Sequence, residues 1–222
     1  MRRTAGRRAV VGAAMLGASS ARAETGRLPV PPGGQLAFRV MRQGSMIGEH
    51  HLTFTAEGGA MTMRADVEIV VRLIGVPVFR FAHHAVEHWQ GGRLVAFASR
   101  TNDDGRAYWV QAQREPAGLA VSASAVPRYT APTNALPMTH WNRAELGVPK
   151  INPERGDLLR PVVTDRGVTL VPDAYGGTIA ARRYNFSGEA TLDVWFDTDD
   201  RWAALAFLGG DQSPITLERI PR

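Results

Sequence analysis

The chain has 222 residues, with 26 basic and 21 acidic side chains, a formal net charge of +5 and no cysteine. At about 100–200 residues per domain, this length fits one domain or two small ones. The lack of cysteine excludes a disulfide framework and any cysteine-ligated zinc or iron–sulfur site. The hydrophobic share of 44% is typical of a folded domain rather than a disordered chain.

Residues 1–23 have the pattern of a cleavable export signal. Arginines at positions 2, 3, 7 and 8 precede a short apolar run over 9–18, and Ala21-Arg22-Ala23 provides the small residues of a cleavage site. We therefore expect cleavage between Ala23 and Glu24, leaving one all-β domain over 24–222 that is periplasmic or secreted, with no stable membrane anchor. The adjacent Arg7 and Arg8 indicate the twin-arginine route; an arginine-rich Sec signal is the alternative.

Removal of the signal changes the charge balance. Five of the 26 basic residues and none of the acidic residues precede Glu24, so the mature chain has 21 of each and no net charge. Proteins that bind nucleic acid keep a basic surface on the folded domain. We therefore expect no nucleic-acid partner.

Residues 35–126 read as a series of strands separated by turn signals such as Gly58-Gly59 and Asp103-Asp104-Gly105. No stretch of helical length intervenes, which favours antiparallel pairing over parallel βαβ units. The expected strands lie at 36–40, 46–55, 61–73, 78–89, 94–101, 108–113 and 119–126.

The segment 61–73 has the clearest alternation of the chain. A one-residue slip would turn its charged side chains into the core, so its pairing register is strongly specified. One face carries Met61, Met63, Ala65, Val67, Ile69, Val71 and Leu73, and the other Thr62, Arg64, Asp66, Glu68 and Arg72.

A proline-rich connection at about 127–157 interrupts this pattern. Asn142 and Glu145 are spaced like a capping box, which predicts one short helical turn ending at Gly147. Strand signals resume at 168–171, 178–186, 190–196, 202–208 and 215–219. We predict an all-β meander of about eleven or twelve antiparallel strands that curls into a barrel or a deeply curved half-barrel, since so many twisted strands do not stay flat.

Several segments resemble a family of exported bacterial proteins known as domain of unknown function 6134. They lie at 38–40, 44–50, 86–89, 92–94, 134–142, 183–188 and 193–197, and the most specific are Pro-x-x-x-Trp-Asn at 137–142 and Trp-Phe-Asp at 195–197. The resemblance covers nearly all of the mature chain. It implies a curved β architecture like that of periplasmic lipoprotein carriers, and it implies no catalytic residue.

The six histidines are unsuited to a shared metal site if they lie in strands. Neighbours such as His50 and His51, or His83 and His84, point to opposite faces. His84 and His88 share a face, but four residues at ~3.3 Å each place them ~13 Å apart, too far to share a zinc ion. We interpret the histidines as outward-facing or hydrogen-bonded side chains and expect no metal or other cofactor.

Recognisable catalytic motifs are missing. Asp197-Thr198-Asp199-Asp200 resembles the start of a calcium loop, but Trp202 stands where such a loop needs glycine and Leu208 where it needs an acid, so a tight turn is the better interpretation. There is no G-x-S-x-G elbow, P-loop or G-x-G-x-x-G sequence. No catalytic residue is predicted, and the sequence does not favour an enzyme.

The leading hypothesis is therefore a non-enzymatic periplasmic binding or carrier module for an apolar or lipid-like ligand. The segment 132–147 either forms a lid over a cavity or caps the core. The alternatives are a periplasmic enzyme with a site assembled from scattered residues and an outer-membrane β-barrel. Candidate ligand-binding residues are the methionine-rich apolar face of the third strand and the connection around Trp141, namely Met61, Met63, Val67, Ile69, His140, Trp141 and Asn142.

Overall fold

The computed structural model describes residues 28–221, so the expected signal peptide and cleavage site lie outside the described residues. Strands make up most of this part of the chain: β1 (Gln35–Arg42), β2 (Ser45–Glu57), β3 (Ala60–Leu73), β4 (Val76–Gln90), β5 (Arg93–Asp103), β6 (Arg106–Glu115), β7 (Gly118–Ala123), β8 (Tyr129–Ala131), β9 (Leu136–Pro137), β10 (Lys150–Ile151), β11 (Leu158–Leu159), β12 (Val162–Pro172), β13 (Thr178–Ser187), β14 (Leu192–Asp197), β15 (Trp202–Leu208) and β16 (Pro214–Arg219). Two short 3-10 helices are η1 (Pro32–Gly34) and η2 (Arg143–Gly147).

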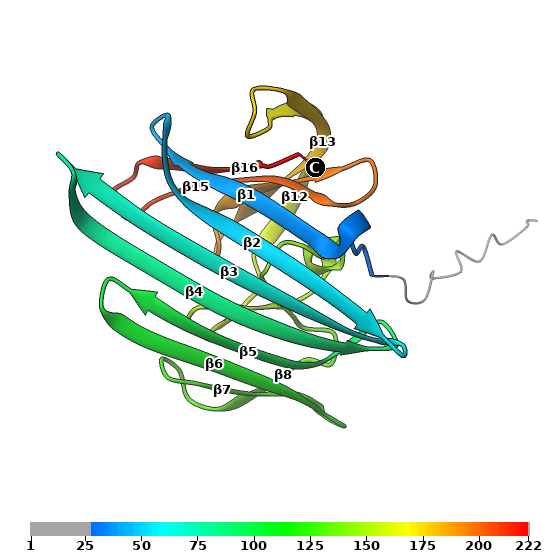
Figure 1. The fold of residues 1–222 in the computed structure, drawn as a ribbon. Helices are drawn as coiled ribbons and strands as arrows, with labels where there is room; N and C mark the ends of the chain where they lie inside the picture. The colour runs from blue at the N-terminus through cyan, green and yellow to red at the C-terminus, as the bar shows by residue number, and fades with distance from the viewer. Residues whose placement is uncertain (1–27, 222) are drawn as a thin grey trace, which may run out of the picture.

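Thirteen of these strands form one curved sheet in the order β12-β13-β14-β15-β16-β1-β2-β3-β4-β5-β6-β7-β8, and every neighbouring pair is antiparallel (Figure 1). The all-β half-barrel prediction is confirmed. Strand β1 lies between β16 and β2, so the first and last strands of the chain pair with each other in the middle of the sheet. Strands β12 and β8 remain free edges, and the sheet is curved but not closed.

The alternation of β3 places its apolar side chains on the concave face, as predicted. Met61, Met63 and Ala65 are buried, whereas Arg64 and Asp66 on the other face are exposed. Burial weakens along the strand until Leu73 is exposed. The β3–β4 hairpin projects beyond its neighbours at this end of the sheet (Figure 1), and its last residues therefore have no layer to pack against.

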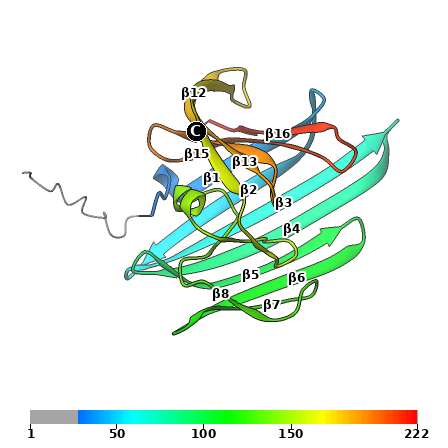
Figure 2. The same ribbon diagram turned by 180° about the vertical axis from the view of Figure 1, so that it is seen from behind.

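The connection between β8 and β12, called here the insert (residues 132–161), lies on the concave side of the sheet (Figure 2). It is more regular than predicted, because β9, β10 and β11 form a small second sheet, and β9 pairs with β10 in parallel. The predicted helical turn is η2. The Asn142 side chain caps it by accepting from the Ala144 N–H at 3.0 Å.

Candidate functional site

The carboxyl group of Glu87, fully buried on the concave face of β4, ties the insert to the sheet. The Thr139 hydroxyl donates to Oε1 at 2.6 Å, and the indole N–H groups of Trp89 and Trp141 donate to Oε2 at 2.8 and 3.0 Å. Burial raises the pKa of Glu87 to about 7, although the three donors act in the opposite direction. Both oxygens accept hydrogen bonds, so this carboxyl holds the insert against the sheet.

A second buried carboxyl, Glu145 in η2, organises the insert itself. It accepts from the backbone N–H of His140 at 3.1 Å, and its other oxygen lies 2.8 Å from His140 Nδ1. These contacts hold His140 at a φ of 65°, a left-handed conformation that is uncommon for a non-glycine residue. Burial of Lys150 lowers the pKa of its ammonium, which donates to the Val148 carbonyl at 2.9 Å.

A row of facing residues crosses the sheet on its concave face from β2 to β5. His50 pairs with Val67, Val67 with His83, and His83 with Thr101. The His83 ring is hydrogen-bonded to Thr101 at 2.8 Å. The Nε2 atom of His50 is shielded from solvent and has no hydrogen-bond partner among the described residues. The His50 ring centroid lies 5.2 Å from that of Trp202.

Both histidines of this row are neutral at neutral pH. Burial lowers the pKa of His50 to about 3, and repulsion from His83, His140 and His51 adds to the effect. Burial likewise lowers the pKa of His83 to about 4. The inner part of the concave face therefore offers neutral imidazoles, which suit a neutral hydrogen-bonding group better than an anion.

Five apolar side chains, called here the apolar strip, continue from this row toward the tip of the β3–β4 hairpin. All five are half-buried, in contrast to the buried Met61 and Met63 further back on the same face. The pairing register places Ile69 opposite Phe81 and Val71 opposite Phe79. The strip consists of Val67, Ile69, Val71, Phe79 and Phe81.

Two clefts of about 580 and 590 Å³ flank η2. At the first, Arg143 donates to Asp200 at 2.8 Å and to the Tyr184 hydroxyl oxygen at 2.6 Å. The second lies beside the β4–β5 turn, with Trp89, Leu94 and Leu136 in its wall. Ala144 is exposed and lines both clefts.

The structure distributes the seven predicted ligand-binding residues over three places. Met61 and Met63 are core residues that face Trp89 and Glu87 in the β3–β4 register. Two others belong to the apolar strip, Val67 and Ile69. The remaining three are buried in the insert, His140, Trp141 and Asn142, and the last also lines both clefts.

Sequence reasoning missed the two most unusual polar groups of the interior, Glu87 and His50. A signal for the first was present: Glu87 stands two residues after Ala85 and two before Trp89, at the period that places all three on one face. The interpretation of all histidines as outward-facing or hydrogen-bonded is wrong for His50. Its half-buried ring lies edge-on against Trp202, on a strand far away in the sequence.

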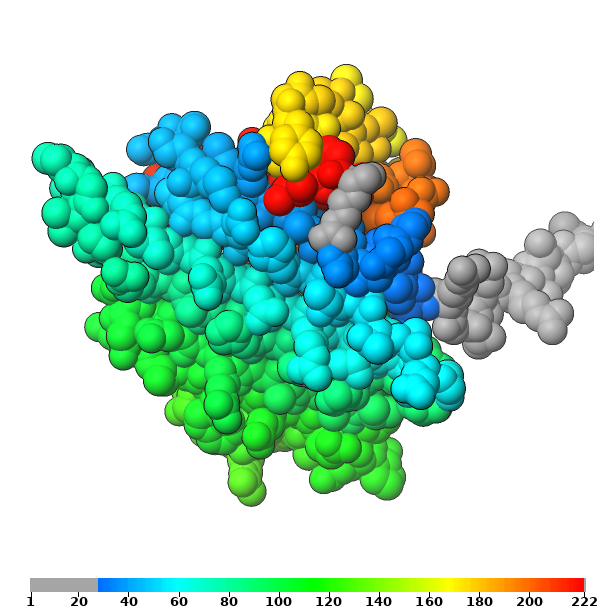
Figure 3. All heavy atoms as spheres, in the orientation of Figure 1, coloured from blue at the N-terminus to red at the C-terminus, as the bar shows by residue number. Residues whose placement is uncertain are grey.

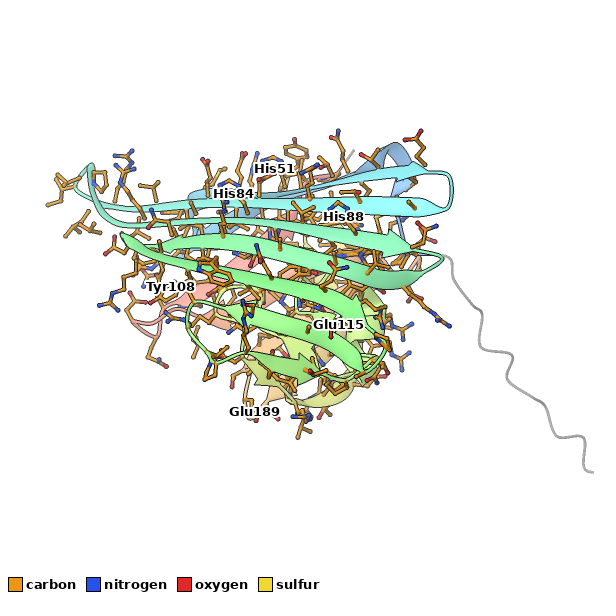
Figure 4. All side chains as sticks on the ribbon, turned by 90° about the horizontal axis from the view of Figure 1, so that it is seen from below. His51, His84, His88, Tyr108, Glu115 and Glu189 are labelled. Atoms are coloured by element: carbon orange, nitrogen blue, oxygen red, sulfur yellow. The ribbon has the colours of Figure 1, made fainter. Side chains whose placement is uncertain are left out.

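Three other histidines are outward-facing and hydrogen-bonded, and the acidic segment after β14 is a turn, as expected from the sequence. His51, His84 and His88 lie on the exposed outer face (Figure 4), with hydrogen bonds to Glu49, Asp66 and Thr62 respectively. The segment after β14 is a tight turn, since Asp197 Oδ1 accepts from the backbone N–H groups of residues 199 and 201.

Residues 28–221 contain neither a cluster of metal ligands nor a helix able to span a membrane. No group of three or more His, Cys, Asp or Glu side chains in this range could hold a metal ion. The helices described there are too short or too polar to cross a membrane.

Comparison with known proteins places the chain in a family. No curated protein sequence matches it. A solved structure, the beta-barrel-like protein of domain of unknown function DUF1849 from Brucella abortus, superposes with a TM-score of 0.57 at 11% identity, covering 84% of this chain and 94% of that one. This likeness shows the shared fold. A family model described as domain of unknown function (DUF6134) matches residues 38–220. The chain therefore belongs to the DUF6134 family.

Proposed function

We propose that this protein is an exported binding or carrier module for a lipid-like ligand that has an apolar chain and one neutral polar group. The observation that carries the proposal is the apolar strip, a run of neighbouring apolar side chains left partly exposed on a concave β face. Covering apolar surface gains about 25 cal/mol per Å², so an apolar chain laid along the strip would be held without any charged contact.

The polar part of the ligand is inferred from the inner end of the strip. Val67 lies between His50 and His83 in the register. An unpartnered ring nitrogen in an apolar surrounding costs free energy that a ligand hydrogen bond would recover. Because both imidazoles are neutral, an ester, amide or alcohol fits better than a free carboxylate.

A fluorescent fatty-acid ester is the probe for this site. Val67→Trp places an indole on the strip and should weaken probe binding at least about tenfold, since it displaces apolar contacts worth roughly 1.5–3 kcal/mol. Val70→Trp is the matched control, because Val70 is equally half-buried on the opposite face of the same strand. Thermal midpoints of all variants show whether the fold survives the larger side chain.

A third variant distinguishes the strip from the clefts. Ala144→Trp fills the space beside η2 without entering the strip, so probe binding should stay as in the wild type. Loss of binding in Ala144→Trp with retention in Val67→Trp would place the ligand in the clefts. No binding by the wild-type protein would refute the carrier hypothesis.

A further inference from the structure

The tip of the β3–β4 hairpin exposes four apolar side chains that lie close together in the chain. Leu73 is 64% exposed, Ile74 96%, Val76 62% and Val78 53%. The hairpin extends from the body of the molecule (Figure 1), and in the space-filling view its tip forms a convex projection (Figure 3). A convex apolar projection can enter another apolar phase, but it cannot enclose a small ligand.

The backbone conformation of the turn makes an isoleucine unexpected at position 74. Ile74 and Gly75 have φ angles of 51° and 79°, as the two central residues of a type I′ turn require, and asparagine or aspartate followed by glycine is favoured there. The β5–β6 turn uses Asp104 and Gly105, at 50° and 88°. A β-branched side chain at positive φ is strained, and Ile74 gains no burial in return.

Two arginines flank the tip. Arg72 and Arg80 are both exposed, and the Arg72 guanidinium donates to the Gly75 carbonyl at 3.1 Å, which holds its charge close to the apolar turn. The Asp104 carboxylate accepts from the Arg80 backbone N–H at 3.3 Å, which leaves the Arg80 guanidinium itself out of that contact. An apolar tip with cationic side chains just behind it matches the layering of an anionic membrane surface.

We propose that the β3–β4 tip docks reversibly on a lipid bilayer that contains anionic lipids. The side chains of Leu73, Ile74 and Val76 enter the acyl region, and Arg72 and Arg80 remain at the headgroups. The apolar strip begins directly behind the tip on the same two strands, so the docked hairpin would place the proposed ligand site next to the membrane. This inference deepens the proposed function, yet vesicle binding and probe binding are separate measurements, and either can fail alone.

A site-specific label tests insertion directly. The chain has no cysteine, so Ile74→Cys provides a unique position for an environment-sensitive nitrobenzoxadiazole label, and Asp104→Cys labels the neighbouring turn as the control. With vesicles of phosphatidylglycerol and phosphatidylcholine, emission from position 74 should shift to the blue and rise about twofold or more, as expected for entry into the acyl region. Emission from position 104 should change little. Pure phosphatidylcholine vesicles should give a weaker response at position 74.

The unlabelled chain provides an independent measurement by vesicle co-sedimentation. Ile74→Asn combined with Val76→Asn should reduce partitioning at least about tenfold. Asparagine tolerates the left-handed turn, so the fold is expected to be retained or stabilised, and a thermal midpoint verifies this. Arg80→Gln should reduce binding to anionic vesicles only. Absence of a shift at position 74, or equal partitioning of the double variant and wild type, would overturn the proposal and favour a protein partner for the tip.

Discussion

Glu87 and the inner histidines show how single residues set the pH response of this fold. The folded-state pKa of Glu87 is raised to about 7 by burial, so its neutral form is favoured by folding. The folded-state pKa values of His50 and His83 are lowered to about 3 and 4, so their neutral forms are favoured too. The two kinds of group have opposite effects on the pH dependence of stability. Glu87 gains charge as the pH rises, whereas His50 and His83 gain charge as the pH falls.

Glu87→Gln separates these contributions. The stability that neutral Glu87 provides is complete below its unfolded pKa of 4.5 and is lost as the pH rises through about 7. The free energy of unfolding of wild type minus that of the variant should therefore fall between pH 5 and pH 8, by at most roughly 3 kcal/mol. Urea unfolding at several pH values measures this difference, and the histidine contribution cancels in it.

Glu115→Gln is the matched control, since Glu115 is exposed on the outer face of β6 (Figure 4). Its difference from wild type should show little change over the same pH range. A flat difference for Glu87→Gln would mean that Glu87 stays ionised in the folded protein.

At the scale of elements, the insert acts as the inner layer of the half-barrel. Trp141 is buried, its ring centroid lies 5.5 Å from that of Trp89 and 5.1 Å from that of Phe54, and its N–H is bound to Glu87. The insert thus buries the concave face over Met61 and Met63. The apolar strip and the hairpin tip extend past it.

Trp141→Ala should lower the free energy of unfolding by about 3–5 kcal/mol, the usual cost of removing a large buried aromatic side chain. Trp109→Ala is the control, because Trp109 is exposed on the outer face of β6, and its effect should stay below about 1 kcal/mol. Denaturant titration followed by circular dichroism provides both values. Equal effects of the two substitutions would show that the insert contributes little to the stability of the sheet.

At the scale of the whole molecule, the proposed function requires export. We expect the exported chain to begin at Glu24 because small residues occupy both flanking positions of the cleavage site. Intact-mass measurement decides this. Arg7→Lys together with Arg8→Lys should block export through the twin-arginine route; undiminished export would indicate Sec, and a retained N-terminus would indicate a membrane anchor.

Local patterns in the sequence determined much of the fold. Alternation over 61–73 predicted which side chains of β3 face inward and which face outward. Glycine and aspartate pairs predicted the turns, and Asn142 predicted the start of η2. These features depend on neighbouring residues, whose geometry has a period of two in strands or a fixed offset at a helix cap.

Only the tertiary structure decided which distant segments meet. Four features join residues far apart in the sequence: the pairing of β1 with β16, the position of the insert on the concave side, the hydrogen bonds from Thr139 and Trp141 to Glu87, and the contact of His50 with Trp202. Periodicity assigns a side chain to a face, but it does not reveal what covers that face. Similar apolar residues occupy the buried part of the concave face, the half-buried apolar strip and the exposed hairpin tip. Their burial differs because the insert covers only the first of these three regions.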